Sequence, residues 1–311
     1  MTRDSVERLD PALRHLAAAR TDLSPPVLGA VRDSLNQRRA EAAISTDTVG
    51  IEVEQREILA PHGHRIAVRI YRGGPPPSPA VIYCHSGAFV LGNLDTDHRQ
   101  CVELARRARV TVFSLEYRLA PEHPFPAAID DAAFILEWVV GSALELGVDA
   151  AAVAVAGSSA GGALAAGLAQ RSAAGLLPTV GYTLLHQPVL DDRDTPSKHE
   201  FTTTPGFDAD AVRWMWLHYL GDRVPGSASV PARSDDLAAL PATMITCSEL
   251  DPLRDEAIDY ARRLMQSGVT TQLHVFGGTC HGFDSLLPDW EVSTRLFEWQ
   301  AAVLRQALLP G

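Results

Sequence analysis

Residues 157–162 read Gly-Ser-Ser-Ala-Gly-Gly, and they organise the rest of the chain. The small and β-branched run 151–156 precedes them and predicts a buried strand. The run 163–170, rich in alanine and leucine, follows them and predicts a helix. A G-x-S-x-G pattern at a strand-to-helix turn is typical of a nucleophile elbow, which lifts the Ser159 hydroxyl above the sheet edge. The five-residue pattern also occurs in ordinary turns, so further residues must support this interpretation.

Length and composition limit the classes of protein that fit. The chain has 311 residues, enough for one large α/β domain with an insertion or for two domains. Its net charge is −11, and no basic run contains interleaved aromatics, so we expect no nucleic-acid partner. No unbroken apolar run approaches about 18 residues, so we expect no membrane span. Without an export signal or metal-binding cysteine spacing, we expect a cytoplasmic protein with reduced thiols and no metal.

Strand and helix patterns alternate along most of the chain. We expect strands at 51–59, 65–71, 81–84, 110–115, 151–156, 180–185, 242–247 and 271–276. We expect helices from Pro11 and at 27–43, 96–108, 126–140, 163–170, 256–266 and 290–308. The fold class is therefore α/β, with an eight-stranded, mostly parallel sheet covered by helices on both faces. The first two strands are expected to form an antiparallel hairpin.

Two segments do not follow this alternation. Residues 1–45 are helical in pattern and precede the first strand, and residues 191–236 contain no clear strand. In the second segment, large apolar residues recur at helical spacing, with Asp208 or Asp210 as the helix cap and Gly221 as its end. These apolar residues are Val212, Met215, Trp216 and Tyr219, with Trp214 beside them. We predict that the two segments form a helical cap over a catalytic domain made of residues 46–190 and 237–311.

A serine nucleophile needs a base, which four histidines after Ser159 could supply. Sites in open α/β sheets form beyond the carboxyl ends of strands. His281 lies in the loop 277–283 that directly follows the last expected strand, whereas His274 lies inside that strand. His199 and His218 lie in the inserted segment. His281 is therefore the expected base.

The base needs an acid to orient it, and in elbow-bearing folds the acid lies between the serine and the histidine. Asp251 follows the strand expected at 242–247 and precedes a helix. It also fits a helix N-cap, and both roles are compatible. Glu249 and Asp255 are the alternatives for the acid.

A tetrahedral intermediate needs N–H donors for its oxyanion. The turn His85-Ser86-Gly87-Ala88-Phe89 follows the strand expected at 81–84 and contains mostly small residues. Its backbone N–H groups, together with that of Ala160, are the expected donors.

Five motifs in this order make the chain resemble the hormone-sensitive-lipase-like (family IV) esterases and lipases of the α/β-hydrolase superfamily. They are HSGAF at 85–89, YRLAPEHPFPAA at 117–128, GSSAGG at 157–162, DPLRDE at 251–256 and HGF at 281–283. The resemblance covers about residues 9 to 308. It implies an α/β-hydrolase fold, a two-part cap, no cofactor and, as one option, a homodimer. It also implies Ser159 as nucleophile, His281 as base, Asp251 as orienting acid and oxyanion donors at Gly87, Ala88 and Ala160.

Two sites depart from the family pattern. Ser86 and Ala88 stand where the usual His-Gly-Gly-Gly motif has glycines, and Ser158 stands where Asp or Thr is usual. An alanine at positive φ would add strain to the oxyanion turn.

The expected activity is that of a serine carboxylesterase acting on short-to-medium acyl esters through an acyl-enzyme. A lipase, an amidase or deacetylase, and a lactonase use the same triad and remain alternatives. A non-catalytic ligand-binding relative is a further alternative. The residues expected to line the substrate pocket are Phe89, Trp214, Met215, Trp216 and Tyr219.

Overall fold

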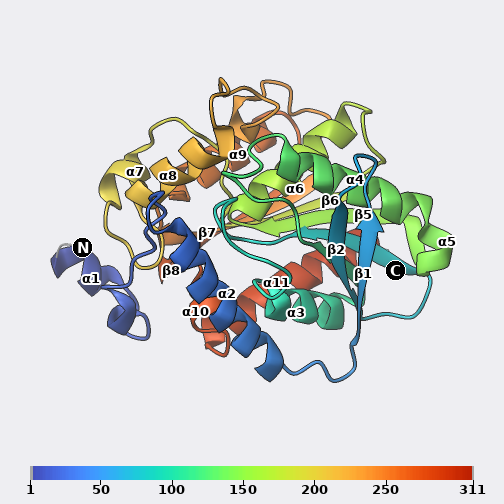
Figure 1. Cartoon of the computed structure of the whole chain (residues 1–311), viewed down its shortest axis with the longest axis horizontal. Coiled ribbons are helices and arrows are strands. Elements are labelled where there is room, and N and C mark those ends of the chain that lie inside the picture. Colours follow the sequence, from blue (N-terminus) through green and yellow to red (C-terminus); the bar gives the residue numbers. More distant parts are fainter. Residues whose placement is uncertain (1–2, 310–311) are drawn as a thin grey trace.

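The computed structural model describes residues 3–309, which contain one eight-stranded sheet between two layers of helices (Figure 1). The strands are β1 (Glu52–Leu59), β2 (Arg65–Arg72), β3 (Ser78–Cys84), β4 (Thr111–Leu115), β5 (Val148–Ser158), β6 (Tyr182–His186), β7 (Ala242–Leu250) and β8 (Thr271–Cys280). Their order in the sheet is β1-β2-β4-β3-β5-β6-β7-β8. The pairs β1–β2 and β2–β4 are antiparallel, and the other pairs are parallel. The predicted mostly parallel sheet with its antiparallel hairpin is confirmed.

Helices cover both faces of the sheet, as predicted (Figure 1). One face carries α3 (His98–Ala108) and α11 (Glu291–Leu308). The other face carries α4 (Ala127–Gly141), α6 (Ala160–Ala173) and α9 (Arg254–Gln266). The short helices α5 (Ala143–Leu146) and α10 (Phe283–Leu286) were not predicted, because four residues are too few for a periodic pattern.

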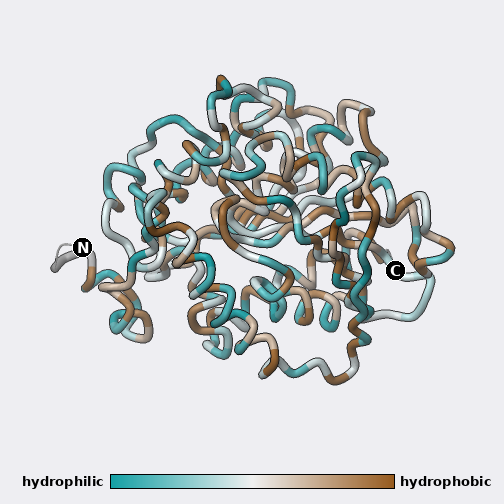
Figure 2. Tube along the Cα trace, viewed as in Figure 1, coloured by the Kyte–Doolittle hydropathy of each residue, from teal (hydrophilic) through white to brown (hydrophobic). Residues whose placement is uncertain are grey.

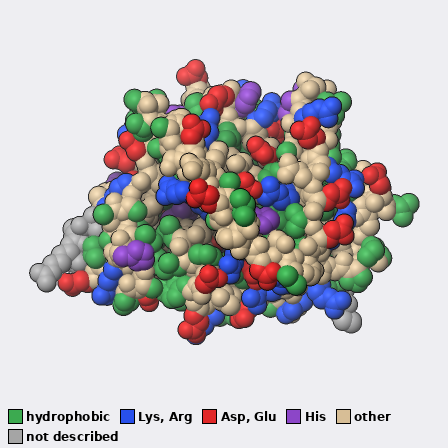
Figure 3. Space-filling model, turned by 60° about the horizontal axis from the view of Figure 1, so that its bottom comes forward, with side chains coloured by type: hydrophobic (Ala, Val, Ile, Leu, Met, Phe, Trp, Pro, Cys, Tyr) green, Lys and Arg blue, Asp and Glu red, His purple; other side chains and the backbone are tan. Residues whose placement is uncertain are grey.

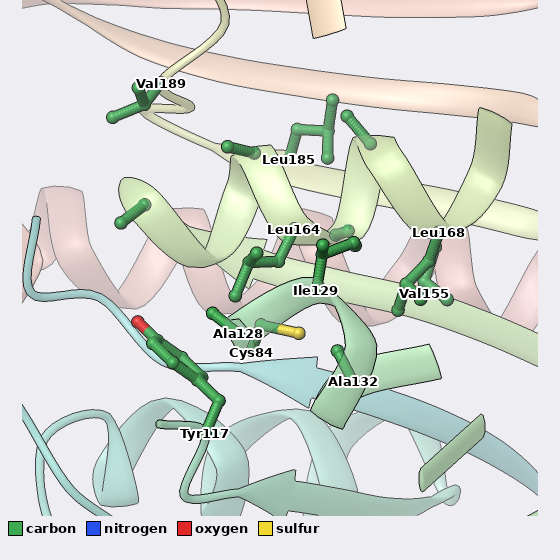
Figure 4. Close-up of a cluster of buried hydrophobic side chains, with 14 of the residues drawn as sticks. Cys84, Tyr117, Ala128, Ile129, Ala132, Val155, Leu164, Leu168, Leu185 and Val189 are labelled. Carbon is green, nitrogen blue, oxygen red and sulfur yellow. The ribbon is translucent and has the colours of Figure 1, made fainter. Parts of the chain in front are cut away.

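The core has two layers because the central strands are buried on both faces. In β3, Ile82 and Cys84 belong to the cluster beneath α4 and α6, whereas Val81 and Tyr83 belong to the cluster beneath α3 and α11. This alternation follows from the two-residue period of a strand, and burial on both faces explains its continuous apolar run. Figure 4 shows part of the first cluster, and Figure 2 shows hydrophobic residues concentrated in the central strands.

The N-terminal segment lies outside the sheet and contains α1 (Arg3–Arg8), the 3₁₀ helix η1 (Arg14–Leu16) and α2 (Leu28–Ser45). The prediction of a helix from Pro11 is wrong. The Asp10 side chain accepts a hydrogen bond from the backbone N–H of Ala12 at 2.9 Å, and its carbonyl accepts one from Leu13 at 2.9 Å. These local bonds favour turns over an α-helix.

The inserted segment contains α7 (Pro196–Glu200), α8 (Ala209–Leu220) and the 3₁₀ helix η2 (Pro231–Arg233). Asp208 caps α8 by accepting a hydrogen bond from Ala211 N at 3.1 Å, and Gly221 ends the helix. The Lys198 ammonium lies 2.7 Å from the Glu256 carboxylate in the buried space between α7 and α9. This ion pair ties the inserted segment to a helix of the sheet layer.

Charged side chains are distributed over the surface. Figure 3 shows acidic and basic side chains interspersed on one face. Within residues 3–309, the helices are either too short or too polar to cross a membrane.

Candidate active site

Three side chains from three separate loops meet at the carboxyl end of the sheet. His281 Nε2 lies 2.9 Å from Ser159 Oγ, and His281 Nδ1 lies 2.8 Å from Asp251 Oδ2. Asp251 is fully buried, and Ser159 is 3% exposed. A carboxylate only accepts hydrogen bonds, so Nδ1 donates its proton to Asp251 and Nε2 accepts from the serine hydroxyl. This arrangement prepares Ser159 to lose its proton to His281.

The backbone around Ser159 forms a sharp turn between β5 and α6. Ser159 has φ +55° and ψ −118°, and its N–H donates to the carbonyl of His186 at 2.8 Å. A Cβ atom on Gly157 would lie 2.2 Å from the Gly161 carbonyl oxygen, and one on Gly161 would lie 1.9 Å from the Cys84 carbonyl oxygen. Both positions therefore require glycine, and the turn they permit lifts Ser159 out of the sheet.

Asp251 and His281 are adjacent because they follow paired residues of neighbouring strands. Leu250 at the end of β7 pairs with Cys280 at the end of β8. Both strands are longer than the sequence predicts, since a register shift between Ser248 and Leu250 lets the pairing continue. As a result, each strand ends directly at a site residue.

The alternative acids point elsewhere. Glu249 Oε2 accepts a hydrogen bond from Gly278 N at 2.8 Å, and Asp255 Oδ2 accepts one from Ser197 N at 2.8 Å. Asp251 also accepts from Leu253 N at 2.9 Å through its other oxygen, so it stabilises the start of the next turn as well.

The other candidate histidines are not among the three side chains that meet at Ser159. His218 forms a 2.8 Å hydrogen bond from Nε2 to the Leu23 carbonyl. His274 lies edge-to-face against Trp299, with ring centroids 4.5 Å apart. His199 lies in α7.

The turn after β3 has an unusual backbone. Gly87 has φ +132°, Ala88 +54° and Phe89 +61°. Within residues 3–309, the backbone N–H groups of Gly87 and Ala88 donate no hydrogen bond. Ala160 is the first residue of α6, where a backbone N–H has no partner inside the helix. All three groups are therefore available as donors to a ligand beside Ser159.

Ala88 carries its methyl group at a strained position. A left-handed conformation costs a residue with a Cβ atom about 1–2 kcal/mol, so the strain expected from the sequence is present. Gly87 cannot be replaced in the same way, because a Cβ there would lie 2.1 Å from the Leu91 carbonyl oxygen.

Asp97 supports this turn, although no sequence pattern indicated it. Its carboxylate accepts hydrogen bonds from Ser86 N at 2.7 Å, from Ser86 Oγ at 2.9 Å and from the Tyr83 hydroxyl at 3.2 Å. Asp97 is 2% exposed. Ser86, the first departure from the family pattern, thus provides a second anchor to a buried carboxylate.

Residues of the 117–128 motif hold the same region from the other side. The Tyr117 hydroxyl donates to the His85 carbonyl at 2.9 Å, and the two rings stack with centroids 4.2 Å apart. Burial lowers the pKa of His85. The Arg118 guanidinium donates to the Asp131 carboxylate from Nε at 3.0 Å and from Nη2 at 2.8 Å.

Gln187 positions the loop of His281 and was also missed. Its side-chain oxygen accepts from Gly282 N at 2.7 Å, and its amide nitrogen donates to Ser248 Oγ at 2.6 Å. Gln187 is fully buried and has φ +45°. Phe207 packs on the His281 ring, with centroids 4.7 Å apart. Cys280 precedes His281 as a buried thiol, whose pKa burial raises to about 12.

A cleft of about 220 Å³ opens above Ser159. Its walls come from the N-terminal segment, the turn after β3, the elbow, the inserted segment and the loop of His281. The N-terminal and inserted segments contribute Ala19, Arg20, Thr21, Leu23, Leu35, Asn36, Arg38, Arg39, Gly206 and Phe207. Sequence patterns did not indicate these residues.

The five residues that the sequence predicts as the lining of the substrate pocket do not line this cleft, so that part of the prediction is wrong for this cleft. They are Phe89, Trp214, Met215, Trp216 and Tyr219. The Phe89 and Tyr219 rings stack with centroids 3.8 Å apart, and Met215 is fully buried. The apolar face of α8 packs into the core, so its helical spacing reports burial and does not place it on the wall of this cleft.

Among residues 3–309, no group of three or more His, Cys, Asp or Glu side chains is arranged to hold a metal ion.

Known proteins share this fold and much of this sequence. The family described as the α/β hydrolase fold matches residues 81–285. The crystal structure of esterase LipW from Mycobacterium marinum is 56% identical, covers 98% of both chains and has a TM-score of 0.96. A structure described as a bacterial heroin esterase is 32% identical, covers 98% of this chain and 99% of its own, and has a TM-score of 0.91. Esterase LipI of Mycobacterium tuberculosis is 38% identical over 70% of this chain and 71% of its own length.

Proposed function

Because the chain belongs to the hormone-sensitive-lipase-like branch of the α/β-hydrolase family, we propose that it is a carboxylic ester hydrolase with Ser159 as its nucleophile. The observation that carries this proposal is the continuous hydrogen-bonded series from Asp251 through His281 to Ser159, with contacts of 2.8 and 2.9 Å. The esterase activity named for relatives such as LipW and LipI agrees with it.

The first half of the proposed reaction forms an acyl-enzyme. Ser159 Oγ attacks the ester carbonyl while His281 Nε2 takes its proton. The buried Asp251 carboxylate stabilises the imidazolium that forms and keeps the ring oriented. Backbone N–H groups of Gly87, Ala88 and Ala160 bind the oxyanion of the tetrahedral intermediate. When this intermediate collapses, His281 returns the proton to the departing alcohol, and the acyl group stays on Ser159.

The second half repeats the same steps with water. His281 Nε2 takes a proton from a water molecule, which attacks the acyl carbonyl, and the same backbone donors bind the new oxyanion. Collapse of this intermediate breaks the bond to Ser159 Oγ, to which His281 gives the proton. The carboxylic acid leaves, and the free enzyme is restored. None of these steps needs a cofactor.

We propose that residues 1–45 and 191–236 form a cap over a catalytic domain of residues 46–190 and 237–311. The cleft walls support this division, because they include residues of the N-terminal segment on either side of Asp22, one face of α2, and Phe207 of the inserted segment. Deletion of residues 1–40 should broaden the dependence of kcat/KM on acyl length or lower kcat/KM overall. A deletion variant that folds and keeps the same acyl-length selectivity would contradict the assignment of these residues to the cap.

We propose short-to-medium acyl esters as substrates, because the walls bound the space above Ser159. An additional methylene helps binding only where it fits. The test is kcat/KM for p-nitrophenyl esters from acetyl to palmitoyl, with a maximum expected at around C4 to C8. A maximum at palmitoyl, with a jump in rate once an emulsion forms, would indicate a lipase instead. Faster turnover of matched amides or lactones would indicate an amidase or lactonase, and no turnover would indicate a ligand-binding relative.

We also propose a cytoplasmic location and a homodimer. All four cysteines are free and buried, which fits a reducing compartment. The homodimer rests on the family resemblance, and sedimentation of the purified chain at a mass of one subunit would contradict it.

A further inference from the structure

The charged groups on the walls of the cleft are unevenly distributed. Arg20, Arg38 and Arg39 line it, and no Asp or Glu does. The whole chain has the opposite bias, with 38 acidic and 27 basic residues. A cluster of like charges against the net charge of the protein attracts a ligand of opposite sign.

Helix α2 presents two of these arginines to the cleft. Leu35 lies three and four positions before Arg38 and Arg39, and Asn36 lies three positions before Arg39, so the four side chains share one side of the helix. Arg32 anchors α2 to the body of the protein, since it donates to the Glu122 carboxylate at 2.9 Å and to the Val90 carbonyl at 2.8 Å. The cationic groups therefore extend from a fixed helix and not from a free loop.

Within the described part of the chain, Arg38 and Arg39 form no salt bridge at an N···O distance of 4.0 Å or less. Arg39 Nη1 donates to the Thr96 carbonyl at 3.0 Å, and Arg38 Nε donates to the Ser34 carbonyl at 3.4 Å. A guanidinium has five N–H donors, so most donors of both side chains remain unused. In contrast, Arg20 Nε lies 3.7 Å from Asp208 Oδ2.

The carboxylates that line the neighbouring hollow already have partners. Asp95, Asp284 and Asp289 line a second hollow that Arg39 also borders. Asp95 pairs with Arg69 at 2.7 Å, and Asp289 pairs with Arg99 at 2.7 Å. Asp284 lies 3.1 Å from His186 Nε2 and accepts from Gln100 at 3.0 Å. These groups do not satisfy Arg39.

Asn36 also lies on this wall, about one helical turn before Arg39. Its side-chain oxygen is buried and has no hydrogen-bond partner among the described residues, so that atom is not exposed to the cleft. The arginines therefore carry the charge of this wall.

We propose that the preferred substrate is an ester bearing a second, ionised acid group, a carboxylate or a phosphate, which Arg38 and Arg39 bind while the ester carbonyl lies at Ser159. The guanidinium fork matches the oxygen pairs of both groups. This proposal rests on the proposed esterase function and specifies its substrate class.

The test compares anionic and neutral esters of equal length. Mono-p-nitrophenyl adipate and suberate are matched with p-nitrophenyl hexanoate and octanoate, which places the charge on the acyl side. On the alcohol side, 4-acetoxybenzoate and 4-acetoxyphenyl phosphate are matched with phenyl acetate, and they distinguish carboxylate from phosphate. We expect at least one anionic ester to exceed its neutral match in kcat/KM by about tenfold. We also expect added salt to reduce this preference.

The double variant Arg38→Gln, Arg39→Gln should reduce the anionic preference by about tenfold or more, because it keeps hydrogen-bonding groups but removes both charges. The matched control is Arg295→Gln on α11, an exposed arginine away from the cleft, which should leave the preference unchanged. Equal or faster turnover of every neutral ester by the unaltered protein would overturn the proposal. Survival of the preference in the double variant would overturn it as well.

A binding measurement separates this proposal from the esterase function. If the unaltered protein hydrolyses no ester, the proposed esterase function is wrong. Titration calorimetry with adipate and phenyl phosphate then still tests whether the cleft binds anions. Binding of either anion that is lost in the double variant would uphold the anion site. Absence of binding of both anions would overturn it.

Discussion

Asp97 accepts two hydrogen bonds from Ser86, one from the backbone N–H at 2.7 Å and one from the hydroxyl at 2.9 Å. Ser86 directly precedes Gly87 and Ala88, whose N–H groups are the proposed oxyanion donors. Because this buried carboxylate binds both the backbone N–H and the side-chain hydroxyl of Ser86, it fixes the backbone at that residue. Asp97 is therefore placed to hold the turn that carries the proposed oxyanion donors, and it does not line the cleft.

Replacing Asp97 with Asn should lower kcat by about 10- to 100-fold with little change in KM, because misplaced donors weaken binding of the transition state more than that of the substrate. The smaller change Ser86→Ala removes one of the two bonds and should have a smaller effect of the same kind. Steady-state kinetics and the rate of inactivation by a phosphonate should fall together. An increase in KM at constant kcat would contradict the positioning role.

Ala88→Gly should stabilise the protein, because glycine adopts φ +54° without the steric cost that alanine has there. Glycine also raises the entropy of the unfolded chain, so the net gain should be about 0.5–1 kcal/mol. Urea unfolding with unchanged m-values measures it. The control Ala302→Gly, at an exposed position inside α11, should destabilise by about 0.5–1 kcal/mol. Destabilisation by both variants would show that Ala88 is not strained.

The Asp284 carboxylate should make the free energy of unfolding decrease at acidic pH. Burial opposes its ionisation, but the charge of His186 and hydrogen bonds from His186 and Gln100 outweigh burial and lower its pKa to about 2. The unfolded chain binds a proton near its ordinary value of 3.8, so it takes up more protons than the native state as the pH falls from about 4 to 2. Stability on the order of 2 kcal/mol is present above that range and lost within it.

The check is the free energy of unfolding against pH for the unaltered protein and for Asp284→Asn. The variant should be less stable at neutral pH and should lose less stability between about pH 4 and 2. Parallel curves for the two proteins would exclude Asp284 as the source of this acid dependence.

Sequence patterns predicted the features that are local in the chain. Strand ends and the glycine turn indicated Ser159, Asp251 and His281, and the structure brings these three side chains within hydrogen-bond distance. The same patterns predicted the sheet, because a buried strand and an amphipathic helix each leave a periodic signal.

Features that depend on contacts between distant segments left no such signal. Asp97 reaches Ser86 across a loop, and Gln187 reaches Gly282 from the end of a different strand. For α8, periodicity correctly indicated a buried face but not what that face packs against. Sequence patterns also did not indicate the arginines of α2, because whether a helical arginine lines a cleft depends on which part of the fold the helix packs against.

Asp251→Asn should keep the fold and lower kcat by about 10⁴-fold, because an amide that donates to Nδ1 stabilises the wrong tautomer.

We propose that Ser159, and not its neighbour Ser158, forms the acyl-enzyme. The site of covalent labelling by a p-nitrophenyl phosphonate, mapped by peptide mass, distinguishes the two serines, and kcat for Ser159→Ala and Ser158→Ala accompanies it. We predict a label on Ser159, a loss of about 10⁴-fold or more in kcat for Ser159→Ala, and most activity retained in Ser158→Ala. A label on Ser158, or near-normal turnover by Ser159→Ala, would show that Ser159 is not the nucleophile.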